Sequence, residues 1–324
     1  LHDDVYALEF QTKMNSIDGD VIGLLNKAIE ICDARKKALV ITNESTDAFS
    51  AGANLMLIVM AAMQGNWTML EKVVADFQNA NQLLRYGPVP VVVAPFALTL
   101  GGGAEVTMHA DAVRAHAELY MGLVEVGVGL LPGGGGCKEL ICRLQSHLPD
   151  NADPFPSVQR AFETIGLAKV ATSAEEARSL GFLRETDGVT FNRDHLTYDA
   201  KQLALGLLRA GYRPPRQRLV RLPGPSGYAN IRSSLQMMLE AHQIMPHDLT
   251  VGSALAKVLT GGNTSPTVRM TEQQLLDLGF LCTGKGFKKL RDPLSFFGES
   301  ILHRCRRQFF GLRAGQLAAV RIGG

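Results

Sequence analysis

Two glutamates, Glu105 and Glu125, follow glycine-rich turns, and this setting points to acid–base chemistry. Glu105 closes the run Leu100–Glu105, which contains three consecutive glycines after a predicted strand. Glu125 lies among apolar residues, where a carboxyl is costly unless it is hydrogen-bonded or protonated. Because two carboxyls that share one water molecule do not ionise together easily, we expect one raised pKa.

Glycine turns of this kind can bring main-chain amides to a reacting group. The run Ala48–Leu55 follows a predicted strand in the same way as Leu100–Glu105, and a third turn, Leu131–Gly136, follows Glu125. Glycine lets an N–H approach a ligand closely, and the start of a helix adds unpaired N–H groups and a partial positive charge. Two such turns, each offering one amide, would form an oxyanion hole for an oxygen that becomes negative.

Each feature also has a simpler interpretation. A single glycine turn is most often a tight connection, and Glu105 taken alone would be a solvated acid or one at a helix N-terminus. A phosphate-binding loop is disfavoured, because Leu131–Gly136 lacks the GK[ST] ending and Leu100–Glu105 does not read GxGxxG. The interpretation as an oxyanion hole beside two acid–base groups therefore depends on the three turns and two acids occurring together in this order.

Alternating strands and helices are expected to position these turns. Apolar runs predict strands at 5–10, 38–42 and 89–94, separated by helical spacing, which is typical of an α/β fold with largely parallel strands. A capping box of Thr68 and Glu71 is predicted to open one of the helices.

The pattern becomes helical after about residue 155. There Ser173 with Glu176 forms a capping box before a stop at Gly181, and Asp248 is a predicted helix cap. Thr271 with Gln274 forms a third box, and the helix that it opens is predicted to break at Gly279.

Composition excludes several classes of protein. The chain has 324 residues, 46% hydrophobic and 20% charged, with a net charge of +2, so it is neither disordered nor attracted as a whole to nucleic acid. Residues 279–324 differ, with 9 basic and 2 acidic residues, a charge of +7, against 24 − 29 = −5 for the rest. A shifted reading frame, a poorly ordered end and a basic surface for acidic phosphates or a partner are the hypotheses for this tail.

Five scattered cysteines without zinc-ligand spacing predict neither a disulfide scaffold nor a metal site, and they favour a reducing, cytoplasmic compartment. The longest apolar run is too short to span a bilayer, so no membrane association is expected. No GxGxxG fingerprint occurs at the head of the chain, so no NAD site and no other cofactor are expected here. Because the sequence starts with Leu1 rather than Met, we expect a fragment or one domain of a longer polypeptide.

The three turns and two glutamates together resemble the crotonase superfamily of enoyl-CoA hydratases and isomerases. The resemblance rests on the runs Phe49–Leu55, Gly101–Glu105 and Glu125–Gly133, and extends to about residue 185. More narrowly, Glu9–Asn15 and the helical C-terminal part look like the hydratase region of a bifunctional fatty-oxidation protein that also carries a 3-hydroxyacyl-CoA dehydrogenase. The fold implied is a crotonase-like spiral of β-β-α units with a helical C-terminal region.

The resemblance also assigns roles to residues. It implies catalysis by Glu105 and Glu125, and an oxyanion hole made by the amides of Ala53 and Gly102. Residues implied in binding CoA or the acyl group are Lys13, Met14, Ala51, Gly52, Asn54, Leu55, Gly101, Pro132 and Gly133. Two departures are Asn54, where many relatives carry Asp, and the apolar pair Leu123-Val124 before Glu125.

The activity implied is hydration of a trans-2-enoyl-CoA to a 3-hydroxyacyl-CoA in fatty acid β-oxidation. Isomerases of the family can work with one glutamate, so the presence of both favours hydration. An enoyl-CoA isomerase and a catalytically silent oligomerisation module are the alternatives. The expected regions are a catalytic core over 1–185, a helical and oligomerising part over 186–278 and the atypical tail over 279–324. A trimer-type homo-oligomer and a fused upstream dehydrogenase, which alone would bind NAD, are the expected partners.

Overall fold

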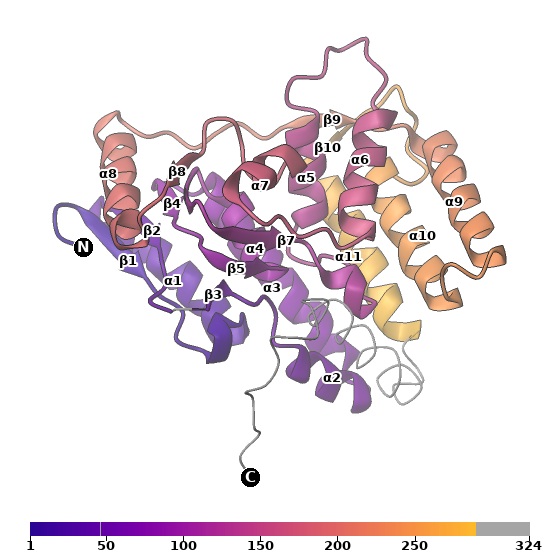
Figure 1. Ribbon diagram of the computed structural model, residues 1–324, viewed down its shortest axis with the longest axis horizontal. Helices are drawn as coiled ribbons and strands as arrows, with labels where there is room; N and C mark the ends of the chain where they lie inside the picture. Colours follow the sequence, from indigo (N-terminus) through magenta and orange to yellow (C-terminus); the bar gives the residue numbers. More distant parts are fainter. Residues whose placement is uncertain (46, 290–324) are drawn as a thin grey trace.

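The computed structural model describes residues 1–45 and 47–289. Its strands form two parallel sheets and one small antiparallel pair (Figure 1). The five-stranded sheet has the order β1-β2-β4-β6-β8, made of β1 (Val5–Leu8), β2 (Ala38–Ile41), β4 (Val91–Val93), β6 (Ala112–His116) and β8 (Gly188–Thr190). The three-stranded sheet has the order β3-β5-β7, made of β3 (Ala48–Ser50), β5 (Ala97–Leu100) and β7 (Leu119–Gly122).

The chain passes repeatedly from the first sheet to the second and then into a helix. The helices of this half are α1 (Gly19–Arg35), α2 (Leu55–Met63), α3 (Trp67–Tyr86), α4 (Gly102–His109) and α5 (Gly136–Leu144), with the short 3-10 turns η1 (Lys13–Asn15) and η2 (Glu125–Val128). Thus β2-β3-α2, β4-β5-α4 and β6-β7-α5 are three β-β-α units. The predicted α/β spiral with parallel strands is confirmed.

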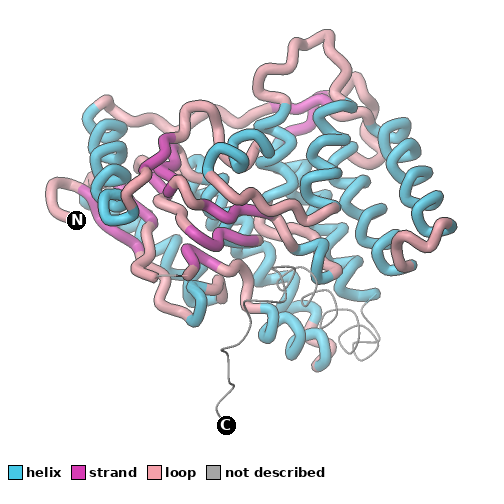
Figure 2. The backbone as a smooth tube through the Cα atoms, in the orientation of Figure 1, coloured by secondary structure: helices cyan, strands magenta, loops and turns pink. Residues whose placement is uncertain are grey.

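The remaining described chain is mostly helical (Figure 2). Its helices are α6 (Phe155–Gly166), α7 (Ala174–Leu180), α8 (Leu196–Arg209), α9 (Gly224–Glu240), α10 (Pro246–Thr260) and α11 (Glu272–Lys289), joined by η3 (Arg193–His195) and the antiparallel strands β9 (Leu219–Arg221) and β10 (Arg269–Thr271). Helix α8 packs on β1, β2, β4 and β6, whereas α10 packs on α6, α9 and α11. Helix α11 in turn contacts α3 and α5, so the C-terminal helices lie against those that follow the second sheet.

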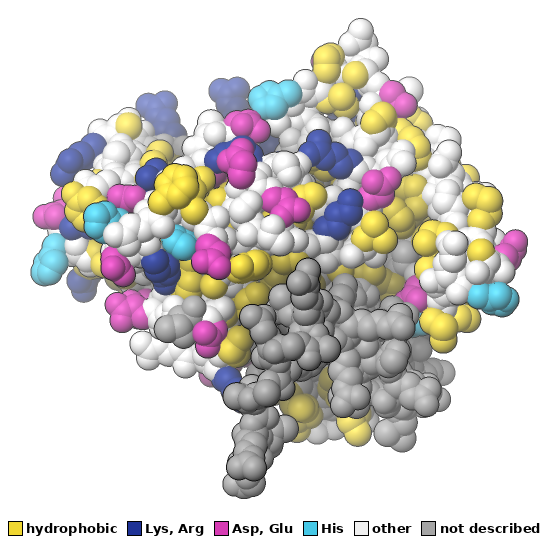
Figure 3. Space-filling model, in the orientation of Figure 1, with side chains coloured by type: hydrophobic (Ala, Val, Ile, Leu, Met, Phe, Trp, Pro, Cys, Tyr) yellow, Lys and Arg dark blue, Asp and Glu magenta, His cyan; other side chains and the backbone are white. Residues whose placement is uncertain are grey.

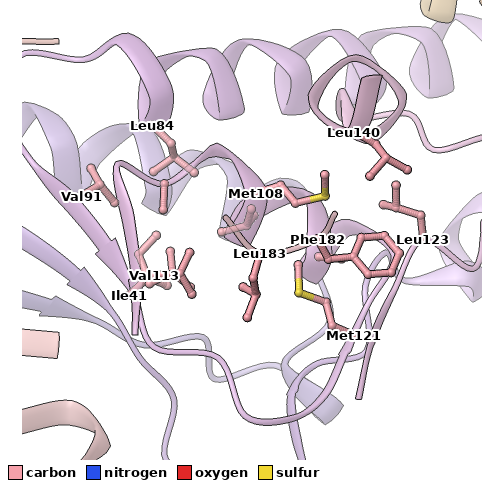
Figure 4. Packing of buried hydrophobic residues seen from close by; sticks show 14 of the residues in the cluster. Ile41, Leu84, Val91, Met108, Val113, Met121, Leu123, Leu140, Phe182 and Leu183 are labelled. Carbon is pink, nitrogen blue, oxygen red and sulfur yellow. The ribbon is translucent and has the colours of Figure 1, made fainter. Parts of the chain in front are cut away.

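Apolar side chains from both sheets and from the helices meet in one large buried cluster. In Figure 4, Leu123, which follows β7, lies near Leu140 of α5 and Phe182, with Met121 of β7 close by. Leu123 and Phe182 are fully buried. The chain on either side of Glu125 is therefore anchored by packing, which fixes where that carboxyl can lie.

Helix α2 is unusual because nearly all of it is apolar while much of it faces solvent. Its sequence, LMLIVMAAM, contains no charged residue. Met56 and Met63 are each more than 60% exposed, and only Ala61 and Ala62 are buried, in a small cluster with Leu70. Elsewhere, basic and acidic side chains are interspersed on the face shown in Figure 3. Within residues 1–45 and 47–289, no helix has the length and apolar character needed to cross a membrane.

Most predicted helix starts are observed, and three details differ. Asn66, not Thr68, caps α3 by accepting from the Met69 amide, because an earlier polar side chain reaches the free N–H groups first. Asp248 lies inside the first turn of α10 and accepts from the Met245 amide. The box at Thr271 is observed. Ser173 caps α7 by accepting from the Glu176 amide, but the Glu176 carboxylate accepts from the Thr172 amide instead of the Ser173 amide, and Gly181 ends α7 in the left-handed conformation.

The predicted break at Gly279 is wrong, because α11 continues to Lys289. Glycine inside a helix costs only about 1 kcal/mol relative to alanine. Packing of α11 against α3, α5 and α10 outweighs this cost. The rest of the basic tail, residues 290–324, lies outside the described residues, and the boundary at residue 185 stays a prediction.

Candidate active site

The three strands of the second sheet deliver their following turns to the same edge. Strands β3, β5 and β7 are parallel, with Ser50 opposite Thr99 and Leu100 opposite Gly122. The Gly101 amide donates to the Gly122 carbonyl over 2.9 Å, which joins the turn after β5 to the end of β7. Three segments that are far apart in the sequence therefore meet where each strand ends.

The turns after β3 and β5 are in close contact. Gly52 has a φ of +86°, and a methyl group added to it would lie 2.7 Å from the Leu100 carbonyl oxygen and 3.1 Å from the Gly102 nitrogen. Only glycine allows this approach and this backbone conformation. The Gly52 amide donates to the Ser50 hydroxyl over 3.2 Å. Within the described part of the chain, the amides of Ala53 and Gly102 have no acceptor, so both remain available to a ligand.

The segment that contains Lys13 and Met14 lies against the turn after β3. The Ala51 amide donates to the Met14 carbonyl over 3.1 Å. The Ile17 amide donates to the Gly52 carbonyl over 2.8 Å, and Asn54 donates back to Ile17 over 3.2 Å. Lys13, Met14 and the run from Ala51 to Leu55 are therefore brought together, as expected, with Leu55 as the first residue of α2.

Glu105 is held by main-chain amides from the start of α5. Its Oε2 accepts from Gly134 over 3.0 Å and its Oε1 from Gly136 over 2.7 Å, while the residue is only 2% exposed. Burial raises the pKa of Glu105 to about 7, although the amides of the Gly134–Gly136 turn and the charge of Lys138 oppose that rise. Glu105 is thus a carboxyl that can exchange a proton near neutral pH.

Glu125 lies on the other side of the turn after β5. A methyl group added to Gly101 would lie 3.0 Å from Glu125 Oε1, so this carboxyl touches the turn whose next residue offers a free amide. Its Oε2 is buried and, among the described residues, has no hydrogen-bond partner. Burial, followed by the negative charge of Glu105, raises the pKa of Glu125 well above its usual range. Glu125 therefore holds its proton to a higher pH than an ordinary glutamate does.

Pro132 and Gly133 open the loop that brings Gly134 to Glu105, and two side chains of α3 hold this loop. Gln78 Nε2 donates to the Gly133 carbonyl over 2.8 Å, and Asn81 Nδ2 donates to the Gly134 carbonyl over 2.9 Å. Sequence reasoning missed both residues. The available signal is two amides three positions apart within the apolar face of a predicted helix, where a buried polar group needs a fixed partner.

Comparison with known proteins gives a family match over part of the chain and a shared fold. Residues 4–149 match the family model described as enoyl-CoA hydratase/isomerase. An enoyl-CoA hydratase from Bacillus anthracis has the same fold, with a TM-score of 0.53 and 20% identity over 78% of this chain and 85% of that one. Residues 4–149 thus match the enoyl-CoA hydratase/isomerase family, and the solved structure shares the fold of this chain.

Two relatives are more similar in sequence. A protein of Bacillus subtilis named "Probable 3-hydroxyacyl-CoA dehydrogenase" is 42% identical over 278 residues, which are 86% of this chain and 35% of that protein. Human mitochondrial methylglutaconyl-CoA hydratase is 32% identical over 128 residues, 39% of this chain and 37% of that one. The chain thus spans about a third of the length of each of these two relatives.

Proposed function

We propose that the protein adds water to a trans-2-enoyl-CoA and forms a 3-hydroxyacyl-CoA. The observation that carries this proposal is the pair of carboxyls around the Gly101–Gly102 turn. Glu105 is held by two amides, and Glu125 presents a buried oxygen that has no partner among the described residues. The family match and the fold support the same class of reaction.

In this proposal the thioester carbonyl accepts hydrogen bonds from the amides of Ala53 and Gly102. These donors stabilise the negative charge that develops on the oxygen as the reaction proceeds, and one such donor is typically worth about 3–4 kcal/mol. The Lys13–Met14 segment, the run from Ala51 to Leu55 and the Pro132–Gly133 loop would border the CoA and acyl groups. No cofactor takes part.

The protons balance over one turnover. Ionised Glu105 takes a proton from water as the water oxygen bonds to C3, and protonated Glu125 gives its proton to C2. Glu105 then holds a proton and Glu125 is ionised, so exchange with solvent restores the starting state. Both carboxyls have raised pKa values, and two neighbouring carboxyls do not ionise together easily, so one can hold a proton while the other accepts one.

The test is loss of the enoyl thioester absorbance with crotonyl-CoA and longer homologues. We expect Glu105→Gln to lower kcat about 10²–10⁴-fold, because glutamine cannot accept the proton. Glu118→Gln is the matched control, since Glu118 is exposed in the β6–β7 turn, and its turnover should equal that of the wild type. Undiminished turnover by Glu105→Gln would falsify the assignment. A 3-enoyl-CoA substrate assayed in parallel distinguishes hydration from double-bond migration.

We further propose that the product passes to a 3-hydroxyacyl-CoA dehydrogenase within the same longer polypeptide, as in fatty acid β-oxidation. The B. subtilis relative supports this proposal, because its name denotes the enzyme that consumes such a product and most of its length lies outside the match. A trimer-type homo-oligomer and a cytoplasmic location belong to the same proposal. Expression of the gene with its flanking sequence, followed by an NAD-coupled assay, tests the fusion.

A further inference from the structure

Three buried charged side chains and one part-buried arginine, from distant parts of the chain, meet next to the turn that holds Glu105. We name Lys138, Glu139, Arg218 and Glu272 the ion cluster. Lys138, Glu139 and Glu272 are at most 1% exposed. Lys138 Nζ lies 2.6 Å from Glu139 Oε1 and 3.1 Å from Glu272 Oε2. Arg218 lies 2.5 Å from Glu139 and 2.9 Å from Glu272, so each cation contacts both acids.

Helix α3 completes the polar contacts of the ion cluster. Gln82 Oε1 accepts from Lys138 over 2.9 Å, and the Tyr86 hydroxyl donates to Glu272. The four members sum to zero charge, and a third cation, Arg143, whose side chain is 6% exposed, lies 3.7 Å from Glu139 Oε2. Among the described residues, Glu139 Oε2 has no hydrogen-bond partner. Such a cluster is favourable only when it is complete, because removal of one member leaves a buried charge without compensation.

The ion cluster is connected to Glu105 through the first turn of α5, and the neutral His109 lies between Glu105 and Glu139 on the other side. Lys138 is two residues after Gly136, whose amide donates to Glu105 Oε1, so the ion cluster anchors the first turn of α5. On the other side, His109 Nδ1 lies 2.7 Å from the Glu105 carbonyl oxygen and donates to it, while its Nε2 lies 3.8 Å from Glu139 Oε1. Burial lowers the pKa of His109 to about 3, so this ring is neutral and positions Glu105 without adding charge.

We propose that Lys138 is a positioning residue for Glu105. Arg218 and Glu272 lie outside the region that the family model matches, and they complete the ion cluster that holds Lys138 in place. The ion cluster holds the α5 amides on the carboxyl and sets the electrostatic potential there. This inference rests on the proposed function only in taking Glu105 as the general base.

The charged and titratable groups around Glu105 come from several elements. Glu125 of η2 raises neighbouring pKa values, and Cys137 of α5 is a thiol whose pKa is raised by burial and by both glutamates. His109 is on α4 itself, and Arg85 of α3 donates to the Ala110 carbonyl at the end of α4. Lys138 is the cation whose charge lowers the pKa of Glu105.

The test compares three variants of the full chain, Lys138→Met, Glu272→Gln and the double variant. Loss of Lys138 removes a positive charge, so the midpoint of Glu105 ionisation should rise by about one pH unit. Loss of Glu272 removes a negative charge, so the midpoint should fall. The double variant keeps the Arg218–Glu139 pair and zero net charge, and should return close to the wild-type midpoint.

Two readouts separate this proposal from the proposed function. The acidic limb of the kcat/KM profile for crotonyl-CoA reports Glu105 if the protein is a hydratase. The carboxylic C=O infrared band that disappears in Glu105→Gln reports its protonation without any substrate. A wild type that does not turn over crotonyl-CoA, but whose variants show the opposite infrared shifts, would refute the proposed function and support the positioning role.

Equal midpoints in all variants, or shifts in the same direction, would overturn the inference. If Lys138→Met does not fold, comparison of the double variant with Glu272→Gln still measures the effect of Lys138, and the double variant should have the higher midpoint. Lys201→Met is the control, because Lys201 pairs with the exposed Asp3 and should leave the midpoint unchanged.

Discussion

Within residues 1–45 and 47–289, two pairs of glutamates have buried carboxyl oxygens, and the pairs differ in what surrounds them. Glu105 and Glu125 have raised pKa values, because burial and mutual repulsion outweigh the main-chain amides. Glu139 and Glu272 have lowered pKa values, because the cations Lys138 and Arg218 outweigh the same burial. The same side chain at similar depth is thus a proton carrier in one place and a fixed anion in the other, and the number of adjacent cations decides which.

The largest expected effect is on the proton carriers. Glu125→Gln should lower kcat about 10³-fold, because the amide cannot deliver a proton to C2. Deuterium incorporation at C2 during turnover in heavy water measures that step directly. Incorporation at the wild-type rate would show that another group donates the proton and that Glu125 is not a proton carrier.

The next effect is on the fixed anions. Arg218→Met leaves Glu139 and Glu272 with one cation between them, so it should lower the free energy of unfolding by about 3–5 kcal/mol. Arg269→Met is the control, because its pair with Asp150 is exposed and should be worth about 0–1 kcal/mol. Urea unfolding measures both. Equal losses of unfolding free energy in the two variants would show that the contacts of the ion cluster contribute no more to stability than an exposed pair does.

A smaller effect should follow from disturbing the amides that hold Glu105. A methyl group at Gly134 would lie 2.3 Å from a Phe77 ring carbon and 2.7 Å from Glu105 Oε2. Gly134→Ala should therefore cost about 1–3 kcal/mol of stability through overpacking. Its kcat should also fall, because the amide moves away from the carboxyl. Gly206→Ala in α8, whose methyl group would meet nothing within 4 Å, is the control and should retain both properties.

The smallest effect is on the pH dependence of stability, which should differ between the two pairs. Glu105 has a folded pKa raised to about 7, so its contribution to stability grows as the pH falls below 7. Between pH 7 and pH 5.5 this should add about 1–2 kcal/mol to the gain that Glu125, whose pKa is also raised, contributes in the same direction, and Glu105→Gln should lose the Glu105 share. Glu272 has a pKa lowered to about 2, so its contribution is present above pH 4.5 and is lost as the pH falls toward 2. Thermal unfolding measured across this pH range, with Glu272→Gln in parallel, tests whether Glu105 causes the change in stability near neutral pH and Glu272 the change at acidic pH.

Local signals in the sequence predicted the first pair and the sheet edge that carries it. The glycine runs and the acids at Glu105 and Glu125 are contiguous features, and parallel strands must bring their carboxyl ends to one edge. The ion cluster could not be predicted in this way. Lys138 and Glu139 look like an exposed charged pair near a helix start, and their partners Arg218 and Glu272 lie about 80 and 130 residues further along the chain.

The errors in the predicted elements have the same origin. The break at Gly279 followed from helix propensity, whereas the observed α11 is held by α3, α5 and α10. Asn66 caps α3 because its side chain accepts from the free Met69 amide. Residue spacing alone does not show whether Asn66 or Thr68 takes this role. Short-range patterns therefore predicted where elements lie, and long-range packing decided where they end.

Main-chain amides as the partners of Glu105 have a consequence for variation at this site. A side-chain substitution can delete a histidine or a lysine, but it cannot delete the N–H groups of Gly134 and Gly136. The hydrogen bonds to the carboxyl can therefore be lost indirectly, through substitution of Gln78, Asn81 or the ion cluster, which keep this backbone in place. Inactivating changes should accordingly accumulate at residues that never meet a substrate.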